Sequence, residues 1–229
     1  MKNMYFRKES GFTVIEILTA MGIVGVIACM TIPGIIMNVR DAQYKVAWEK
    51  AFSSFSDVIK GVKKDNCGQV KGAAANGDEF KDKLLPYLQY TGHAYYGVRP
   101  SYTPSGYKKL NGNDLTPDID LPLYPSIQLT NGMIIYVVNF SPDCSYNDAT
   151  YITNQCSDIK IDVNGKKGPN VQGRDLFSIN VFDDTVLPAG CSGVKNCNDY
   201  WTVAMTCNPG STASDNSGSG CSAKYLQGN

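Results

Sequence analysis

The chain has 229 residues, enough for one domain of ordinary size together with a membrane anchor. Its 21 basic and 21 acidic side chains balance, so the overall charge gives no indication of nucleic-acid binding. Eight cysteines are typical of an oxidising, extracytoplasmic compartment in which disulfides form. Zinc binding is the alternative, but the chain has no C-x2-C pair and only one histidine, His93.

Residues 12–37 form an apolar stretch long enough to span a bilayer as a helix, and Glu16 is its only charged residue. Lys2, Arg7 and Lys8 precede it, so the positive-inside rule places the amino terminus in the cytoplasm and the rest of the chain outside. A secretory signal peptide would have a shorter apolar core followed by a small-residue cleavage site, and neither is present. A plain single-pass anchor would leave the buried carboxylate unexplained.

Residues 8–16, KESGFTVIE, resemble the prepilin processing site of type IV pilins and type II secretion pseudopilins. In that family a membrane prepilin peptidase cuts after the glycine and methylates the new terminal amine. The resemblance therefore implies a leader of residues 1–11 and a cut between Gly11 and Phe12. The motif combines a short basic leader, a glycine, an aromatic residue, a glutamate and an apolar helix, and it covers only residues 1–40.

By the same resemblance, Glu16 matches the glutamate that the family uses in assembly. Pairing Glu16 with the terminal amine of a neighbouring subunit would neutralise two poorly solvated charges and could set the axial stagger between subunits. Contact with a lipid headgroup is the alternative role. Gly25 and Pro33 fall where many type IV pilins have a glycine and a helix-loosening proline. Proline lacks an N–H donor, so we expect a kink or local opening at Pro33.

Beyond the apolar stretch, residues 38–64 are predicted to continue as an amphipathic helix that ends near Asp65. Apolar side chains recur there at three- and four-residue steps, namely Tyr44, Trp48, Ala51, Phe55, Val58, Ile59 and Val62. We therefore expect one long helix from Phe12 to Lys64, apolar on all sides in its first half and on one side in its second half.

Residues 66–125 are rich in turn-forming residues and tyrosines, and a short helix is predicted around Asp78–Tyr90. We interpret the tyrosines as packing for a loop without regular structure, the alternative being an adhesive surface.

Strand patterns follow, and the first two flank an Asn-Gly turn that predicts a hairpin. The predicted strands are Ser126–Leu129, Met133–Phe140, Asp158–Val163, Leu176–Phe182 and, more weakly, Trp201–Thr206. We expect an antiparallel sheet whose single apolar face packs on the carboxyl half of the long helix. This is an α+β fold with the layout of a pilin, in which residues 38–229 form the extracytoplasmic globular domain.

The segment between two of these strands carries oxygen-bearing side chains that could bind calcium, namely Asp158, Asp162, Asn164, Asn170 and Asp175. The spacing is not that of an EF-hand, because Lys166, Lys167 and Gly173 occupy positions where that motif needs an oxygen ligand, a glycine and a glutamate. The competing interpretation, which the sequence favours, is that Asn-Gly and Pro-Asn simply turn the chain. Calcium is thus a possible ligand, and the sequence indicates no other cofactor.

Cys29 lies at membrane depth, which leaves seven cysteines outside, so at least one is free or pairs between chains. The simplest pairing closes three short loops: Cys144–Cys156, Cys191–Cys197 and Cys207–Cys221. The last of these loops contains the low-complexity segment 208–220. Cys67 is then unpaired and expected to be buried, the rival being a disulfide between Cys67 and a cysteine of the sheet.

The chain has no nucleophile elbow, P-loop, dinucleotide fingerprint or zinc-protease motif, so the sequence does not predict an enzyme. It predicts a structural subunit that enters the bacterial cytoplasmic membrane through one span and is processed by prepilin peptidase. Copies of this chain, or related pilins, would then assemble with it into a type IV pilus or a secretion pseudopilus. The alternative is a membrane-anchored adhesin or binding protein that does not polymerise, which would have no need of Glu16.

Overall fold

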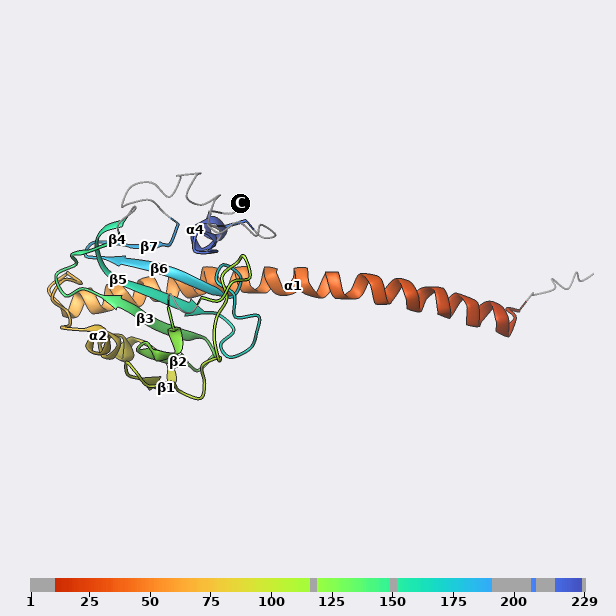
Figure 1. The fold of residues 1–229 in the computed structure, drawn as a ribbon, viewed down its shortest axis with the longest axis horizontal. Helices are drawn as coiled ribbons and strands as arrows, with labels where there is room; N and C mark the ends of the chain where they lie inside the picture. The colour runs from red at the N-terminus through yellow and green to blue at the C-terminus, as the bar shows by residue number, and fades with distance from the viewer. Residues whose placement is uncertain (1–10, 116–118, 149–151, 191–206, 209–216, 228–229) are drawn as a thin grey trace, which may run out of the picture. The chain divides into compact units, whose positions relative to one another are not determined.

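The computed structural model describes residues 11–115, 119–148, 152–190, 207–208 and 217–227. The chain divides into two compact units, one ending at Ala42 and the other beginning at Gln43. Helix α1 (Val14–Asp65) contributes to both units, and Figure 1 labels it with the elements that follow.

The bounds of α1 agree with the long helix predicted from the sequence to within two residues at each end. The helix continues past Pro33, and a kink at that residue stays a prediction. At the other end, Cys67 adopts a left-handed conformation with φ 55°. The amide of Gly68 then donates to the carbonyl of Lys63 at 2.7 Å, which is the hydrogen bond of a Schellman cap and explains where the helix stops.

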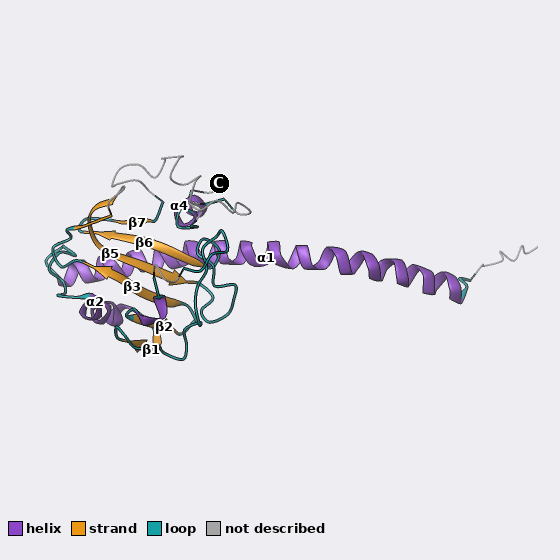
Figure 2. Cartoon of the chain, in the orientation of Figure 1, coloured by secondary structure: helices purple, strands orange, loops and turns teal. Residues whose placement is uncertain are grey.

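In the part of the chain that the structure describes, seven antiparallel strands form one sheet, with the order β1-β2-β3-β5-β6-β7 and with β4 paired to β5 (Figure 2). The strands are β1 (Tyr90–Ala94), β2 (Ser126–Leu129), β3 (Ile134–Phe140), β4 (Tyr146–Asp148), β5 (Ile152–Asp162), β6 (Leu176–Phe182) and β7 (Val186–Pro188). The sequence predicted β2 and β6 with their observed bounds, and it predicted β3 to within one residue. The predicted strand Asp158–Val163 is the end of a longer strand, β5, and the predicted strand Trp201–Thr206 lies outside the described residues.

The predicted hairpin between β2 and β3 is confirmed, with Ile127 paired to Ile135. Its turn depends on Gly132, which has φ 89°, a conformation that glycine adopts without a steric penalty. The Asn131 side chain accepts a hydrogen bond from the amide of Met133 at 3.0 Å and so stabilises the turn.

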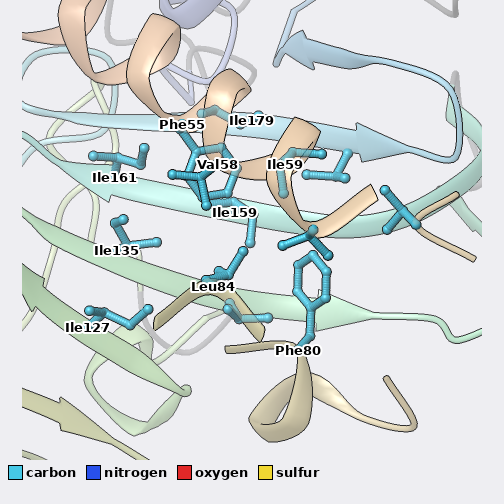
Figure 3. Packing of buried hydrophobic residues seen from close by; sticks show 14 of the residues in the cluster. Phe55, Val58, Ile59, Phe80, Leu84, Ile127, Ile135, Ile159, Ile161 and Ile179 are labelled. Atoms are coloured by element: carbon cyan, nitrogen blue, oxygen red, sulfur yellow. The ribbon is translucent and has the colours of Figure 1, made fainter. Parts of the chain in front are cut away.

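One face of the sheet packs on the carboxyl half of α1, as predicted (Figure 3). Phe55 and Ile59 of the helix meet Ile135, Ile159 and Ile179 of the central strands, and all five side chains are buried. Burying side chains of this size contributes about 1.5–3 kcal/mol each, so this face is the main source of stability for the second unit.

The opposite face of the sheet is also buried, contrary to the prediction of a single apolar face. Ile134, Tyr136 and Val138 of β3 point to that side, where Tyr107 and Leu121 pack on them. The connection between β1 and β2 therefore covers the second face, and Tyr107 has the packing role proposed for the tyrosines. Tyr87, Tyr90, Tyr95 and Tyr96, in contrast, are exposed.

Helix α2 (Gly77–Leu84) is shorter than predicted, because the chain passes into a 3-10 turn, η1 (Leu85–Tyr87), that contains Pro86. A second 3-10 turn, η2 (Leu121–Leu123), precedes β2. The short helix α4 (Cys221–Leu226) was not predicted, and it lies against β6 and β7.

Candidate functional site

The predicted processing site precedes α1 and has no regular secondary structure. Gly11 has no atom within 4 Å of the position that a Cβ would occupy, and Phe12 is 84% exposed. The peptide bond between these residues is therefore open to a peptidase. Residues 1–10, which include the basic side chains of the leader, lie outside the described residues.

Glu16 and Thr13 form a reciprocal capping box at the start of α1. Glu16 Oε2 accepts from the Thr13 amide and from Thr13 Oγ1, both at 2.8 Å. In return, Thr13 Oγ1 accepts from the Glu16 amide at 3.4 Å. These bonds satisfy amide groups that the first turn of a helix leaves without partners. The T-x-x-E pattern of residues 13–16 is the sequence signal of this capping box.

The first half of α1 presents apolar side chains on all sides. Between Phe12 and Val39 the large apolar side chains are all exposed, including Ile17, Met21, Val24 and Ile35. Among the described residues, α1 is the one helix long and apolar enough to cross a membrane. Gly25 lies in this half of the helix with open space around it.

A second candidate site is the loop between β5 and β6, which brings two carboxylates together. Asp162 ends β5, Asp175 immediately precedes β6, and both side chains are fully buried. Asp162 Oδ1 accepts from the amides of Asn164 at 3.0 Å and Gly165 at 2.7 Å. Asp162 Oδ2 accepts from the Tyr107 hydroxyl at 2.7 Å.

Asp175 is held in the same way by the far end of the loop. Its Oδ2 accepts from the Asn170 amide at 2.8 Å and its Oδ1 from the Val171 amide at 2.7 Å. Burial raises the pKa of Asp175, while these amides and the nearby Asn164 side chain lower it by smaller amounts. Burial, followed by the charge of Asp175, raises the pKa of Asp162 well above its usual range. The two acids are therefore neighbours that repel each other when both are ionised.

The same loop holds amide oxygens that are buried without a hydrogen-bond donor. In the described part of the chain, four buried side-chain polar atoms have no partner, and three are Asn164 Oδ1, Asn170 Oδ1 and Gln172 Oε1. Four of the five predicted calcium ligands thus belong to one loop. Sequence reasoning missed Gln172 because a glutamine in a turn gives no signal of burial.

Asp158, the fifth predicted ligand, does not join this cluster. It lies four residues before Asp162 in β5, which corresponds to roughly 13 Å along an extended strand. Its carboxylate is 3.9 Å from the ammonium group of Lys160.

Two of the three disulfides predicted from the sequence are present, Cys144–Cys156 and Cys207–Cys221. Cys191 and Cys197 lie outside the described residues. Cys67 has no disulfide, as predicted, but its side chain is exposed and not buried, because it caps the end of α1.

One other group of possible metal ligands occurs among the described residues, formed by Cys144, Cys156 and Asp183. The two cysteines are joined in a disulfide and so offer no thiolate to a metal.

Comparison with protein-family models, with characterised proteins and with solved structures finds no match to this chain.

Proposed function

We propose that this chain is a structural subunit of a type IV pilus or secretion pseudopilus, held in the cytoplasmic membrane before assembly and cut between Gly11 and Phe12. The observation that carries the proposal is the first half of α1, which is apolar on every side and begins directly after an accessible glycine–phenylalanine bond. A helix of this kind is stable in lipid and is equally stable among parallel copies of itself. Transfer between these two environments is the step that assembly would use.

The geometry of Glu16 supports a further role for its carboxylate in assembly. Oε2 binds Thr13, whereas no hydrogen bond from a described residue reaches Oε1. A cut after Gly11 leaves the Thr13 amide intact, so the capping box survives processing. The cut also creates a positive amine at Phe12, and Oε1 of a neighbouring subunit is a suitable partner for it. An unpaired carboxylate inside a membrane helix costs about 3 kcal/mol on insertion scales, which favours such a pairing.

The capping box is also a competing explanation for Glu16, because it would serve a monomeric anchor equally well. A substitution that removes the charge of Glu16 but keeps its side-chain oxygen distinguishes the two roles. Glutamine caps a helix as glutamate does, since its side-chain oxygen still accepts from the Thr13 amide, but it cannot neutralise an amine. Glu16→Gln therefore keeps the first role and removes the second.

The experiment compares filament yield in sheared extracellular fractions for Glu16→Gln, Glu16→Ala and Glu49→Gln. Glu49 is an exposed acid in the second half of α1, so its substitution controls for the loss of one negative charge. We expect both Glu16 variants to insert in the membrane and to yield no filaments, while Glu49→Gln assembles normally. Normal filaments from Glu16→Gln would show that the carboxylate only caps the helix.

The alternative function, an anchored adhesin or binding protein that does not polymerise, predicts a different outcome. The wild-type protein would then stay in the membrane fraction, and shearing would release none of it. Each Glu16 variant would behave as the wild type does.

A further inference from the structure

The ammonium group of Lys81 is buried where helix α2 meets strand β1. The Lys81 side chain is fully buried, whereas lysine side chains are normally at the surface. Its Nζ lies 2.9 Å from Oδ1 of Asp82 and 3.2 Å from Nδ1 of His93. The Tyr95 ring covers the same ammonium group, with its centroid 3.4 Å from Nζ. A buried ammonium group is unfavourable unless it is paired and hydrogen-bonded, so these three neighbours stabilise its charge.

The contact with Lys81 determines the protonation state of His93. An ammonium group only donates hydrogen bonds, so Nδ1 of His93 accepts from Lys81 Nζ and carries no proton. The ring is then neutral, with its proton on Nε2. A protonated ring would turn a donor at Nδ1 toward the ammonium group and would place two positive charges next to each other.

The acids of α2 do not offset this second positive charge. Asp82 already forms an ion pair, and its side chain is 43% exposed, so water weakens its effect. Asp78 Oδ1 accepts from the amide of Tyr96 at 2.9 Å and is held by that bond. On the side of the sheet, the residue of β2 that pairs with His93 is the uncharged Ile127.

Two tyrosines keep the imidazole ring of His93 in place. The Tyr90 and Tyr95 rings both form T-shaped contacts with it, and each centroid is 5.7 Å from that of the imidazole. His93 is nevertheless exposed, so protons from the solvent reach it. Strand β1 lies at the edge of the sheet, where it pairs with β2 alone among the described strands. A change at His93 can therefore loosen this edge without moving the core.

We propose that His93 is a pH-sensitive contact, which links β1 to α2 while its ring is neutral and releases Lys81 when its ring is protonated. Histidine commonly changes charge between pH 5 and 8. Protonation removes a hydrogen bond and adds a repulsion in the folded state, but not in the unfolded chain. The free energy of unfolding should therefore fall as the pH drops through this range. The contact lies in the second unit and does not depend on the filament function.

The first measurement tests the geometry of the contact. His93 is the only histidine of the chain, so labelling the full chain in detergent with 15N-histidine gives signals from one imidazole ring. The chemical shifts of the two ring nitrogens distinguish the tautomers. At about pH 8 we expect the tautomer with the proton on Nε2. The other tautomer would overturn the proposal, because its Nδ1 cannot accept from Lys81.

The second measurement compares urea unfolding of the wild type, His93→Asn and Lys81→Met between about pH 5 and pH 8. The Asn side-chain oxygen reaches the position of Nδ1 and accepts from Lys81 without taking up a proton. Methionine keeps the length of the lysine side chain but removes its charge. We expect the urea midpoint of the wild type to fall toward pH 5, and we expect this fall to be lost in both variants.

The change in the midpoint with pH, and not its absolute value, decides the outcome. The raised pKa values of Asp162 and Asp175 add a pH dependence of their own, which is common to all three proteins. If His93 only fills space, His93→Asn would shift the midpoint equally at every pH, and this result would overturn the proposal. A full wild-type pH dependence in Lys81→Met would also overturn it, since no ammonium group then faces the ring. Either variant decides the matter if the other fails to fold.

Discussion

Trp48 donates its indole N–H to the backbone carbonyl of Ser222 at 2.9 Å, although 174 positions separate the two residues in the chain. Both residues are completely buried. The Trp48 ring also stacks on Phe177 of β6, with the ring centroids 4.8 Å apart. The Trp48 side chain of α1 therefore contacts both the sheet and the carboxyl-terminal helix α4 in the second unit.

Trp48→Phe should therefore destabilise the second unit. The substitution keeps an aromatic ring against Phe177 but removes the hydrogen bond from the indole to the Ser222 carbonyl, and a hydrogen bond of this kind contributes about 0.5–1.5 kcal/mol. Denaturant unfolding of the full chain in detergent measures this cost. An unchanged unfolding midpoint would show that the hydrogen bond contributes nothing to stability.

The capping box predicts that Thr13→Ala loosens the first turn of α1, because both the Glu16 amide and the Glu16 carboxylate lose a partner. Loss of an N-cap side chain costs about 1 kcal/mol. Thr13→Ser retains the hydroxyl and serves as the matched control. Amide hydrogen exchange of residues 14–17 should be faster in the alanine variant alone, and equal rates in the two variants would contradict the role of the hydroxyl.

The cysteine arrangement predicts which thiols react in the folded protein. An alkylating reagent applied without reductant should label Cys67, which is exposed and not disulfide-bonded. Peptide mapping should find Cys144, Cys156, Cys207 and Cys221 protected until the protein is reduced. A native disulfide that contains Cys67 would contradict the structure.

Acid should weaken the turn that contains Asp143. Hydrogen bonds from Ser145 and Ser141 lower the pKa of this carboxyl to about 2. Because its pKa is lower in the folded state than in the unfolded state, the carboxylate stabilises the fold above about pH 4, and the effect is lost as the pH falls toward 2.

The variant Asp143→Asn should flatten the decline in stability over this pH window, measured by urea unfolding at each pH. Ser141→Ala removes one of the donors and should flatten it in part. An acid dependence identical to that of the wild type in both variants would exclude Asp143 as its source.

Elements with a strong local pattern were predictable from the sequence. The long helix α1 follows from its apolar stretch and the three- and four-residue steps beyond it, and the hairpin of β2 and β3 follows from Asn131-Gly132. The elements that were missed depend on contacts between distant parts of the chain. Helix α4 has only six residues, and it is held by Trp48 and by the Cys207–Cys221 disulfide.

The second buried face of the sheet was missed for a similar reason. Polar residues alternate in β6, which normally indicates a face in contact with water. Ser178 and Asn180 are instead buried, because Lys160 and Gln155 of the neighbouring strand hydrogen-bond to them at 2.8 and 3.1 Å. A sequence pattern shows which residues are polar, but not that polar partners from another strand will satisfy them.

The residues of the candidate site were also predictable only in part. The sequence identified Asp162, Asn164, Asn170 and Asp175 because acids and amides gather there at turn-forming positions. It could not show that Asp158 lies too far along β5, since the loop closes only after Asp162 pairs with Leu176.

The amino-terminal mass of protein recovered from sheared extracellular filaments tests the proposed function most directly. We predict a chain that begins at a methylated Phe12, and we predict that Gly11→Val, which places a branched side chain at the cut, yields an uncut chain and no filaments. Gly25→Ala, a change in the open part of the same helix, is the control and should be processed normally. Filaments that contain residues 1–11 intact, or the absence of this chain from every extracellular fraction, would contradict the account.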